Sequence, residues 1–203
     1  MSPLRSLGMD FLLWNLRGEA AQRADPVRVS GIGPGESLAI KCRSDGVLTP
    51  MPEIALYQPD IPPNVGTILR LGACLGIIIH IIEPTGFAWS ERSLRRAGLD
   101  YAAAAAIFRH ASYEAFCAST NGRRQVLLST KAELAYTEFA FRSGDILVMG
   151  RETSGVPDVV HRRVEERITI PMRQGMRSLN VAIACAMVLG EALRQTGGFP
   201  ETP

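Results

Sequence analysis

The chain has 203 residues, a formal net charge of +2 and a hydrophobic content of 46%. This length is enough to bury one substantial core, so we expect a single domain with at most an appended segment. The small net charge does not by itself indicate a polyanionic partner, although an uneven distribution of charge could still form a basic face. No apolar run reaches the roughly 18 residues of a membrane-spanning helix, and nothing resembles an export signal.

The residues that most often bind metals are scattered along the chain: Cys42, Cys74, Cys117, Cys185, His80, His110 and His161. Their spacing matches neither a zinc site nor a disulfide framework, and the histidines suggest no nucleophile triad. We therefore expect reduced cysteines, no metal, and a cytoplasmic location. His80 lies within an apolar run, which favours a satisfied, partly buried side chain over a catalytic one.

The sequence pattern changes near residue 51. Residues 1–50 show no sustained period of 2 or 3.6, so we expect a poorly ordered N-terminal extension, and residues 51–203 are expected to form the folded domain. The stretch GIGPGES at 31–37 is glycine-rich but lacks the lysine of a phosphate-binding loop, which favours a flexible turn.

Beyond residue 51, predicted strands and helices follow one another in regular order. We expect strands at 53–57, 77–83, 124–130, 145–150 and 167–171, and helices at 65–76, 112–119, 157–164 and after 180. Strands that read as continuous apolar runs and alternate with helices indicate an α/β fold, with a mainly parallel sheet covered by helices on both faces.

The first predicted helix has one clear apolar face. Its members are Val65, Ile68, Leu69, Gly72 and Leu75. Arg70 lies about 140° around the helix from Val65, so its side chain need not be buried.

Three loops after predicted strands are the best candidates for a ligand site, because ligands gather at the carboxyl ends of parallel strands. They are STKAE at 129–133, GRETSGVP at 150–157 and PMRQGMRSLN at 171–180. Gly150 and Gly155 permit close approach of backbone to a ligand, Pro157 suits the first turn of the next helix, and Ser178 can cap the last one. An ordinary structural turn is the alternative for 150–157. The chain lacks G-x-G-x-x-G after its first strand, which argues against a dinucleotide.

Four segments together resemble the SPOUT RNA methyltransferases, and among these the small TrmL-type enzymes that methylate the wobble nucleotide of tRNA. The segments are 56–70 (LYQPDIPPNVGTILR), 80–101, 146–157 and 168–195, and the likeness extends over roughly residues 53–197. The resemblance implies a C-terminal trefoil knot and S-adenosylmethionine as methyl donor. It also implies tRNA as the substrate.

The resemblance also assigns residues to roles. The positions that hold the donor correspond to Leu128, Gly150, Ile170, Ser178 and Leu179. Apolar strand ends can flank an adenine while backbone groups bind its edge. Without the family likeness, Leu128 and Ile170 would be read as core residues and Ser178 as a helix cap.

Arg70 corresponds to the arginine that these enzymes place at the acceptor ribose. A guanidinium stays protonated at neutral pH, because its pKa is about 12 or higher. We therefore expect Arg70 to bind phosphate and polarise the hydroxyl rather than act as a base. Asn64 and Glu152 match further motif positions. Asn64 and Asn180 would order loops, and Glu152 would help to neutralise the sulfonium or tie its loop to a basic neighbour; a turn stabiliser and an exposed acid are the respective alternatives.

Arg92, Arg95 and Arg96 share one side of a predicted short helix near Phe87 and Trp89, which favours contact with RNA phosphates and an extruded base. A merely solvated helix face is the alternative.

The last helix is apolar nearly all round. We therefore expect it to serve both the core and a homodimer interface.

The sequence departs from the family pattern at two positions. Arg151 replaces the usual proline, and Gly190 stands where tyrosine is common, which leaves details of the dimer or RNA contact open. Two alternative functions also stay open: methylation of ribosomal RNA, and a catalytically silent RNA-binding protein.

Overall fold

The computed structural model describes residues 27–30, 37–42, 48–89 and 106–200. Within these ranges the strands form two separate sheets. The small one is antiparallel and consists of β1 (Val27–Ser30), β2 (Ser37–Cys42) and β3 (Leu48–Pro50). These strands were not predicted from the sequence, whose pattern before residue 51 shows no clear period. The boundary near residue 51 falls between β3 and the first strand of the large sheet.

The large sheet has six parallel strands in the order β6-β5-β4-β8-β7-β9. In chain order the strands are β4 (Glu53–Tyr57), β5 (Ile78–Ile82), β6 (Ala106–His110), β7 (Gln125–Leu128), β8 (Ile146–Met149) and β9 (Glu166–Ile168). The predicted α/β fold with a mainly parallel sheet is therefore confirmed. The order reverses between β4 and β8, so the loops after these two central strands meet at one edge of the sheet.

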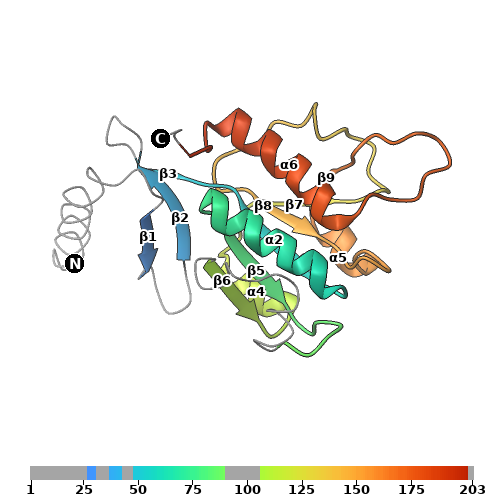
Figure 1. The fold of residues 1–203 in the computed structure, drawn as a ribbon, viewed down its shortest axis with the longest axis horizontal. Coiled ribbons are helices and arrows are strands. Elements are labelled where there is room, and N and C mark those ends of the chain that lie inside the picture. The colour runs from blue at the N-terminus through green and yellow to red at the C-terminus, as the bar shows by residue number, and fades with distance from the viewer. Residues whose placement is uncertain (1–26, 31–36, 43–47, 90–105, 201–203) are drawn as a thin grey trace.

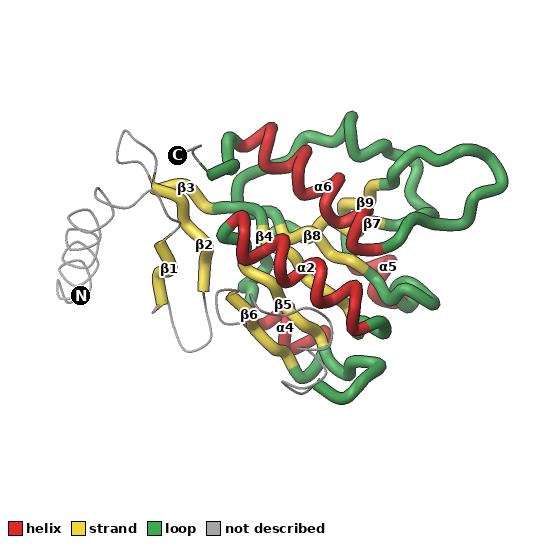
Figure 2. Tube along the Cα trace, in the orientation of Figure 1, coloured by secondary structure: helices red, strands yellow, loops and turns green. Residues whose placement is uncertain are grey.

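Helices cover both faces of this sheet, as Figures 1 and 2 show. On one face, α2 (Pro62–Leu75) and α6 (Val181–Thr196) lie side by side and pack on residues such as Ile54 and Leu56. On the other, α4 (Tyr113–Ser119) and α5 (Asp158–Arg163) pack on Ala55 and Tyr57. Successive residues of one buried strand thus serve opposite faces. None of the helices in the described ranges is long and apolar enough to cross a membrane.

A chain of polar side chains runs through the core from Glu53, the first residue of β4, to Ser119, the last residue of α4. Glu53 is fully buried and accepts from Arg123 Nη1 at 2.8 Å, and its Oε2 lies 2.7 Å from His80 Nε2. His80 Nδ1 lies 2.9 Å from His110 Nε2, and His110 Nδ1 lies 3.1 Å from Ser119 Oγ. His80 is therefore a satisfied buried side chain, as its apolar surroundings in the sequence predict.

Candidate functional site

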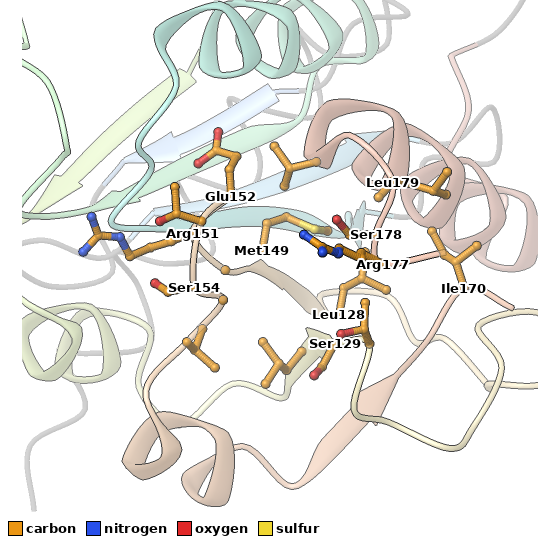
Figure 3. A pocket seen from close by; sticks show the side chains of 18 of the residues that line it. Leu128, Ser129, Met149, Arg151, Glu152, Ser154, Ile170, Arg177, Ser178 and Leu179 are labelled. Carbon is orange, nitrogen blue, oxygen red and sulfur yellow. The ribbon is translucent and has the colours of Figure 1, made fainter. Parts of the chain in front are cut away.

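A cavity of about 560 Å³ opens at the carboxyl edge of the sheet, beyond β7, β8 and β9. The three loops singled out in the sequence all line it, and Figure 3 shows side chains from each of them, such as Ser129, Glu152 and Ser178. The first turn of α2 lines the cavity as well. Seven of the predicted site residues lie in its wall: Asn64, Leu128, Gly150, Glu152, Ile170, Ser178 and Leu179. Segments from residue 61 to residue 184 therefore converge on one hollow, as the rule for parallel sheets predicts.

The strand ends give this cavity an apolar floor. Leu128, Met149 and Ile170 follow or end the three strands, and Val156 and Ala184 add to the same wall. Hydroxyl, amide and charged groups stand around them, among them Ser129, whose Oγ lies 3.5 Å from His161 Nε2. An apolar floor with a few convergent polar groups suits a flat aromatic ligand that carries polar edges.

The loop after β8 is folded tightly on itself. Arg151 and Gly155 exchange two backbone hydrogen bonds, of 3.0 and 2.9 Å, and Gly155 has a φ of 69°. A Cβ on Gly150 would lie 2.7 Å from the carbonyl carbon of Gly155 and 2.8 Å from its Cα. From the sequence, both glycines were expected to permit close approach of the backbone to a ligand. In the structure, Gly150 makes room for the loop's own backbone, and Gly155 adopts a left-handed conformation.

Glu152 is held by one group from the loop before α2 and one from the first turn of that helix. Its Oε2 accepts from the backbone N–H of Asp60 at 2.9 Å, and its Oε1 accepts from Asn64 Nδ2 at 3.1 Å. Asn64 Oδ1 in turn accepts from Asn180 Nδ2 at 2.9 Å. Both carboxylate oxygens of Glu152 are thus bound to neutral N–H donors, so this acid ties two loops together. The basic neighbour expected from the sequence is not its partner in these contacts.

The N-cap of α6 differs from the prediction. Asn180 caps the helix, because its Oδ1 accepts from the backbone N–H groups of Ala182 and Ile183 at 2.9 and 3.3 Å. The prediction that Ser178 caps this helix is wrong: Ser178 lies two residues earlier, in the cavity wall. Pro157 is likewise the N-cap residue of α5 and not part of its first turn.

Arg70 is exposed on α2, as its place on the helix predicts, and Val65, Ile68, Leu69 and Gly72 are buried on the opposite side. It does not belong to the wall of the cavity, which α2 reaches with Asn64. Six residues of helix, about 9 Å along the axis, separate Arg70 from Asn64, so the structure does not bring Arg70 into the cavity wall.

The predicted RNA-binding residues Arg92, Arg95 and Arg96 lie outside the described residues. The segment that leads to them carries an aromatic pair, Phe87 and Trp89, with ring centroids 5.9 Å apart and planes at 24°. Arg109 lies over the Trp89 ring at 5.4 Å and also pairs with Glu83.

Sequence reasoning missed Asp60. Its carboxylate binds Arg151 Nη2 at 2.6 Å and Thr153 Oγ1 at 2.6 Å, at the edge of the cavity. The only signal in the sequence was an acid placed just before the first predicted helix. In the part of the chain that the structure describes, no group of three or more His, Cys, Asp or Glu could hold a metal ion.

The chain is similar to known RNA-modifying proteins. Residues 51–190 match the model of the SpoU rRNA Methylase family. A tRNA (cytidine(34)-2'-O)-methyltransferase of Beijerinckia indica is 61% identical over 148 residues, which cover 72% of this chain and 92% of that protein. The protein of the same name from Escherichia coli is 45% identical over 149 residues, covering 72% and 95%.

Solved structures give the same likeness. One described as "Structural insights into the 2-OH methylation of C/U34 on tRNA" has a TM-score of 0.68 and 40% identity, covering 71% of this chain and 95% of that one. An AdoMet-bound rRNA methyltransferase from Sinorhizobium meliloti has a TM-score of 0.64 and 28% identity, covering 71% and 56%. The matched region contains every described residue that lines the cavity.

Proposed function

We propose that this chain, which belongs to the SpoU rRNA methylase family, transfers a methyl group from S-adenosylmethionine to the ribose 2′-hydroxyl of the wobble nucleotide of tRNA. The observation that carries the proposal is the convergence of the loops at 129–133, 150–157 and 171–180 on one cavity at the carboxyl edge of the sheet, together with the first turn of α2. The two relatives at 61% and 45% identity bear the name of this activity, which favours tRNA over other RNA. A tRNA substrate also implies that the chain works in the cytoplasm.

We assign donor binding to Leu128, Gly150, Ile170, Ser178 and Leu179. Leu128 and Ile170 stand at the ends of neighbouring strands, so an adenine could lie against them while backbone groups of 150 and 178 bind its polar edge. The presence of an AdoMet-bound structure among the similar proteins supports this choice of donor. The donor would supply an electrophilic methyl carbon on a sulfonium.

The transfer makes few chemical demands on the protein. The 2′-oxygen attacks the methyl carbon in line with the carbon–sulfur bond, the bonding pair stays on sulfur, and the hydroxyl proton leaves to water or to an RNA phosphate oxygen. We assign Arg70 to the phosphate and the attacking hydroxyl, because its planar fork suits a phosphate and its charge favours the developing oxyanion. Asn64 and Glu152 then act by holding the loops between α2 and the donor.

Three features of the architecture belong to the same proposal. A trefoil knot at the C-terminal part is proposed from the family to which the chain belongs. A homodimer through α6 is supported by two exposed apolar side chains four residues apart on this helix, Ile183 and Met187. Residues 1–50 are proposed to be an extension of the domain that starts at residue 51.

Methylation of ribosomal RNA is the second candidate. The name of the family model and the Sinorhizobium meliloti enzyme favour it. The higher identity of the tRNA enzymes speaks against it.

Nucleoside mass spectrometry decides between these functions. Total tRNA and ribosomal RNA are digested from cells with the gene, without it, and with the deletion complemented. We expect 2′-O-methylation at the wobble position to vanish in the deletion strain and to return on complementation. Purified protein and tRNA with labelled donor should reproduce the product. Loss of a ribosomal methyl group alone would support the second candidate, and tRNA binding without transfer would indicate a silent protein.

A further inference from the structure

Asp60 lies in the loop between β4 and α2, and its carboxylate is occupied by one neighbouring loop. Oδ1 accepts from Arg151 Nε at 2.9 Å and from Arg151 Nη2 at 2.6 Å. Oδ2 accepts from Thr153 Oγ1 at 2.6 Å and from the Thr153 backbone N–H at 3.4 Å. The side chain of Asp60 is only 11% exposed. Both bonds from the Arg151 guanidinium are charge-assisted, and they converge on one carboxylate oxygen, Oδ1.

The backbone of Asp60 strengthens the same junction. Its N–H donates to Glu152, so Asp60 contacts three successive residues of the loop after β8. A third loop closes its other side: the N–H of Gly86 donates to Pro59 O at 2.9 Å, and a Cβ on Gly86 would lie 3.0 Å from both Cα and Oδ1 of Asp60. Asp60 therefore cannot move without moving the loops around it.

An exposed ion pair usually contributes little, because solvent screens it and two long side chains lose freedom. The pair of Asp60 and Arg151 differs in its surroundings. Arg151, Glu152 and Thr153 are all part of the cavity wall, and the acid is largely shielded from solvent. The hydrogen bonds from Arg151 and Thr153 also hold the pKa of the Asp60 carboxyl below its usual range, so the carboxylate stays charged at neutral pH.

We propose that Asp60 is a positioning residue for methyl transfer. Its carboxylate holds the loop of residues 150–156 against the start of α2, and this contact fixes the position of the donor-binding wall relative to the helix that carries Arg70. This role rests on the proposed function. Asp60 is not among the residues that line the cavity, whereas Arg151, Glu152 and Thr153 are, so Asp60 would act through these three residues. The unusual arginine at 151 thereby has a task within the chain itself.

Replacement of Asp60 by asparagine tests the role with little change of shape. One carboxylate oxygen becomes an NH₂ group that must face N–H donors of Arg151 or the hydroxyl of Thr153, and the charge is lost. The loop should then sample positions in which the donor fits poorly. We expect the Kd for S-adenosylmethionine, measured by calorimetry on the full chain, to rise about tenfold, as for the loss of one hydrogen bond to a charged group.

The measurement includes Asp60→Asn, Arg151→Gln, the double variant, and Thr153→Val. If Asp60 and Arg151 act through the same contact, the double variant binds the donor no more weakly than the worse single variant, because the first substitution already removes that contact. The KM for tRNA should stay within about twofold of wild type, since the changed wall faces the donor. Thr153→Val should weaken donor binding less than Asp60→Asn does. If Asp60→Asn does not fold, the donor affinity of Thr153→Val is the test of the proposal instead.

The matched control is another two-point ion pair, between Arg124 and Asp145. Arg124 donates to Asp145 at 2.8 and 2.7 Å from residues that precede β7 and β8, at the edge of the sheet opposite the cavity. Arg124→Gln should lower the melting temperature and leave donor affinity unchanged. Wild-type affinity in Asp60→Asn, or additive losses in the double variant, would overturn the proposal. A wild-type protein that binds no donor would overturn the proposed function instead.

Discussion

Asn180 joins the first turn of α2 to the start of α6, across 116 positions of sequence: its Nδ2 donates to Asn64 Oδ1 at 2.9 Å. The Oδ1 of the same side chain caps α6 through the backbone N–H of Ala182, also at 2.9 Å. The side-chain amide of Asn180 therefore binds the cavity residue Asn64 through its N–H group and caps α6 through its oxygen. Because the two functions lie on different atoms, they can be separated by substitution.

Asn180→Ala should lower both stability and methylation, whereas Asn180→Asp should lower methylation alone. Alanine removes the cap, at a cost of about 1 kcal/mol in the free energy of unfolding. Aspartate keeps a capping oxygen but cannot donate to Asn64, and its charge faces an acceptor. Urea denaturation and initial rates of methyl transfer give the two readouts. Ser112→Ala removes the cap of α4, where Ser112 accepts from Ala115 N, and should cost stability without a change in rate.

The order of elements could be predicted from the sequence because most strands are unbroken apolar runs. The strand β6 was missed. It follows an alanine-rich stretch, and two of its five side chains are only partly buried and a third is exposed, so its pattern lacks the apolar run of a central strand. As the end strand of the sheet it has one neighbour, β5, among the described strands. An edge strand needs less apolar surface than a central one, which weakens its signal in the sequence.

The cavity could be predicted only as a set of loops. The parallel sheet fixes which edge the loops share, but it does not fix which side chains meet there. Ser178 and Asn180 are both plausible caps by residue type, and backbone geometry selects Asn180. Asp60 and Arg151 are 91 positions apart, so no local pattern could pair them.

Gly150→Ala should weaken donor binding, and Gly190→Ala should stabilise the protein. The Cβ at 150 would stand under 3.0 Å from the backbone of Gly155, so the loop must open. At Gly190, within α6, the same Cβ meets nothing within 4 Å. Alanine is favoured over glycine in a helix by about 0.5–1 kcal/mol. Thermal denaturation and calorimetry with S-adenosylmethionine measure both effects, and a stable Gly150→Ala variant with unchanged affinity would contradict the role of the tight loop.

Stability should fall as the pH drops below neutrality, through His110. Burial, together with the nearby His80, lowers the pKa of His110 from 6.5 to about 4. The unfolded chain takes up a proton near pH 6.5 while the folded chain does not, so the stabilising contribution is complete above that pH and is lost as the pH falls toward 4. The loss should reach at most about 3 kcal/mol. Unfolding in urea from pH 7.5 to 4.5 measures the slope, and His110→Gln should flatten it.

The exposed stripe on α6 should decide the oligomeric state. Ile183 is 56% exposed on this helix, and the exposed Met187 lies one turn further along. A charge placed there would have to be buried unpaired in an interface between two copies. We therefore expect light scattering to give a dimer for wild type and a monomer for Ile183→Arg at micromolar concentration. Val159→Arg, at an exposed apolar residue of α5, should remain dimeric. A monomeric wild type would remove the proposed interface.

Arg70→Lys should separate donor binding from chemistry. Lysine keeps the positive charge but presents a single ammonium, so it cannot hold a phosphate with two parallel hydrogen bonds and polarise the hydroxyl at once. Arg70 is exposed on the side of α2 away from its buried face, so the fold should tolerate the change. We expect the rate of methyl transfer to fall about a hundredfold, as misplacement of a reacting group by an ångström can cause, with the Kd for the donor unchanged.

The control for Arg70 is Arg142→Lys, at an exposed arginine in the turn before β8 and away from the cavity. It makes the same chemical change and should leave the transfer rate at the wild-type value. Single-turnover measurements with saturating donor and tRNA report the methyl-transfer step itself, free of product release. If Arg70→Lys transferred the methyl group at the wild-type rate, charge alone would suffice at this position and the planar fork would have no part in holding the phosphate.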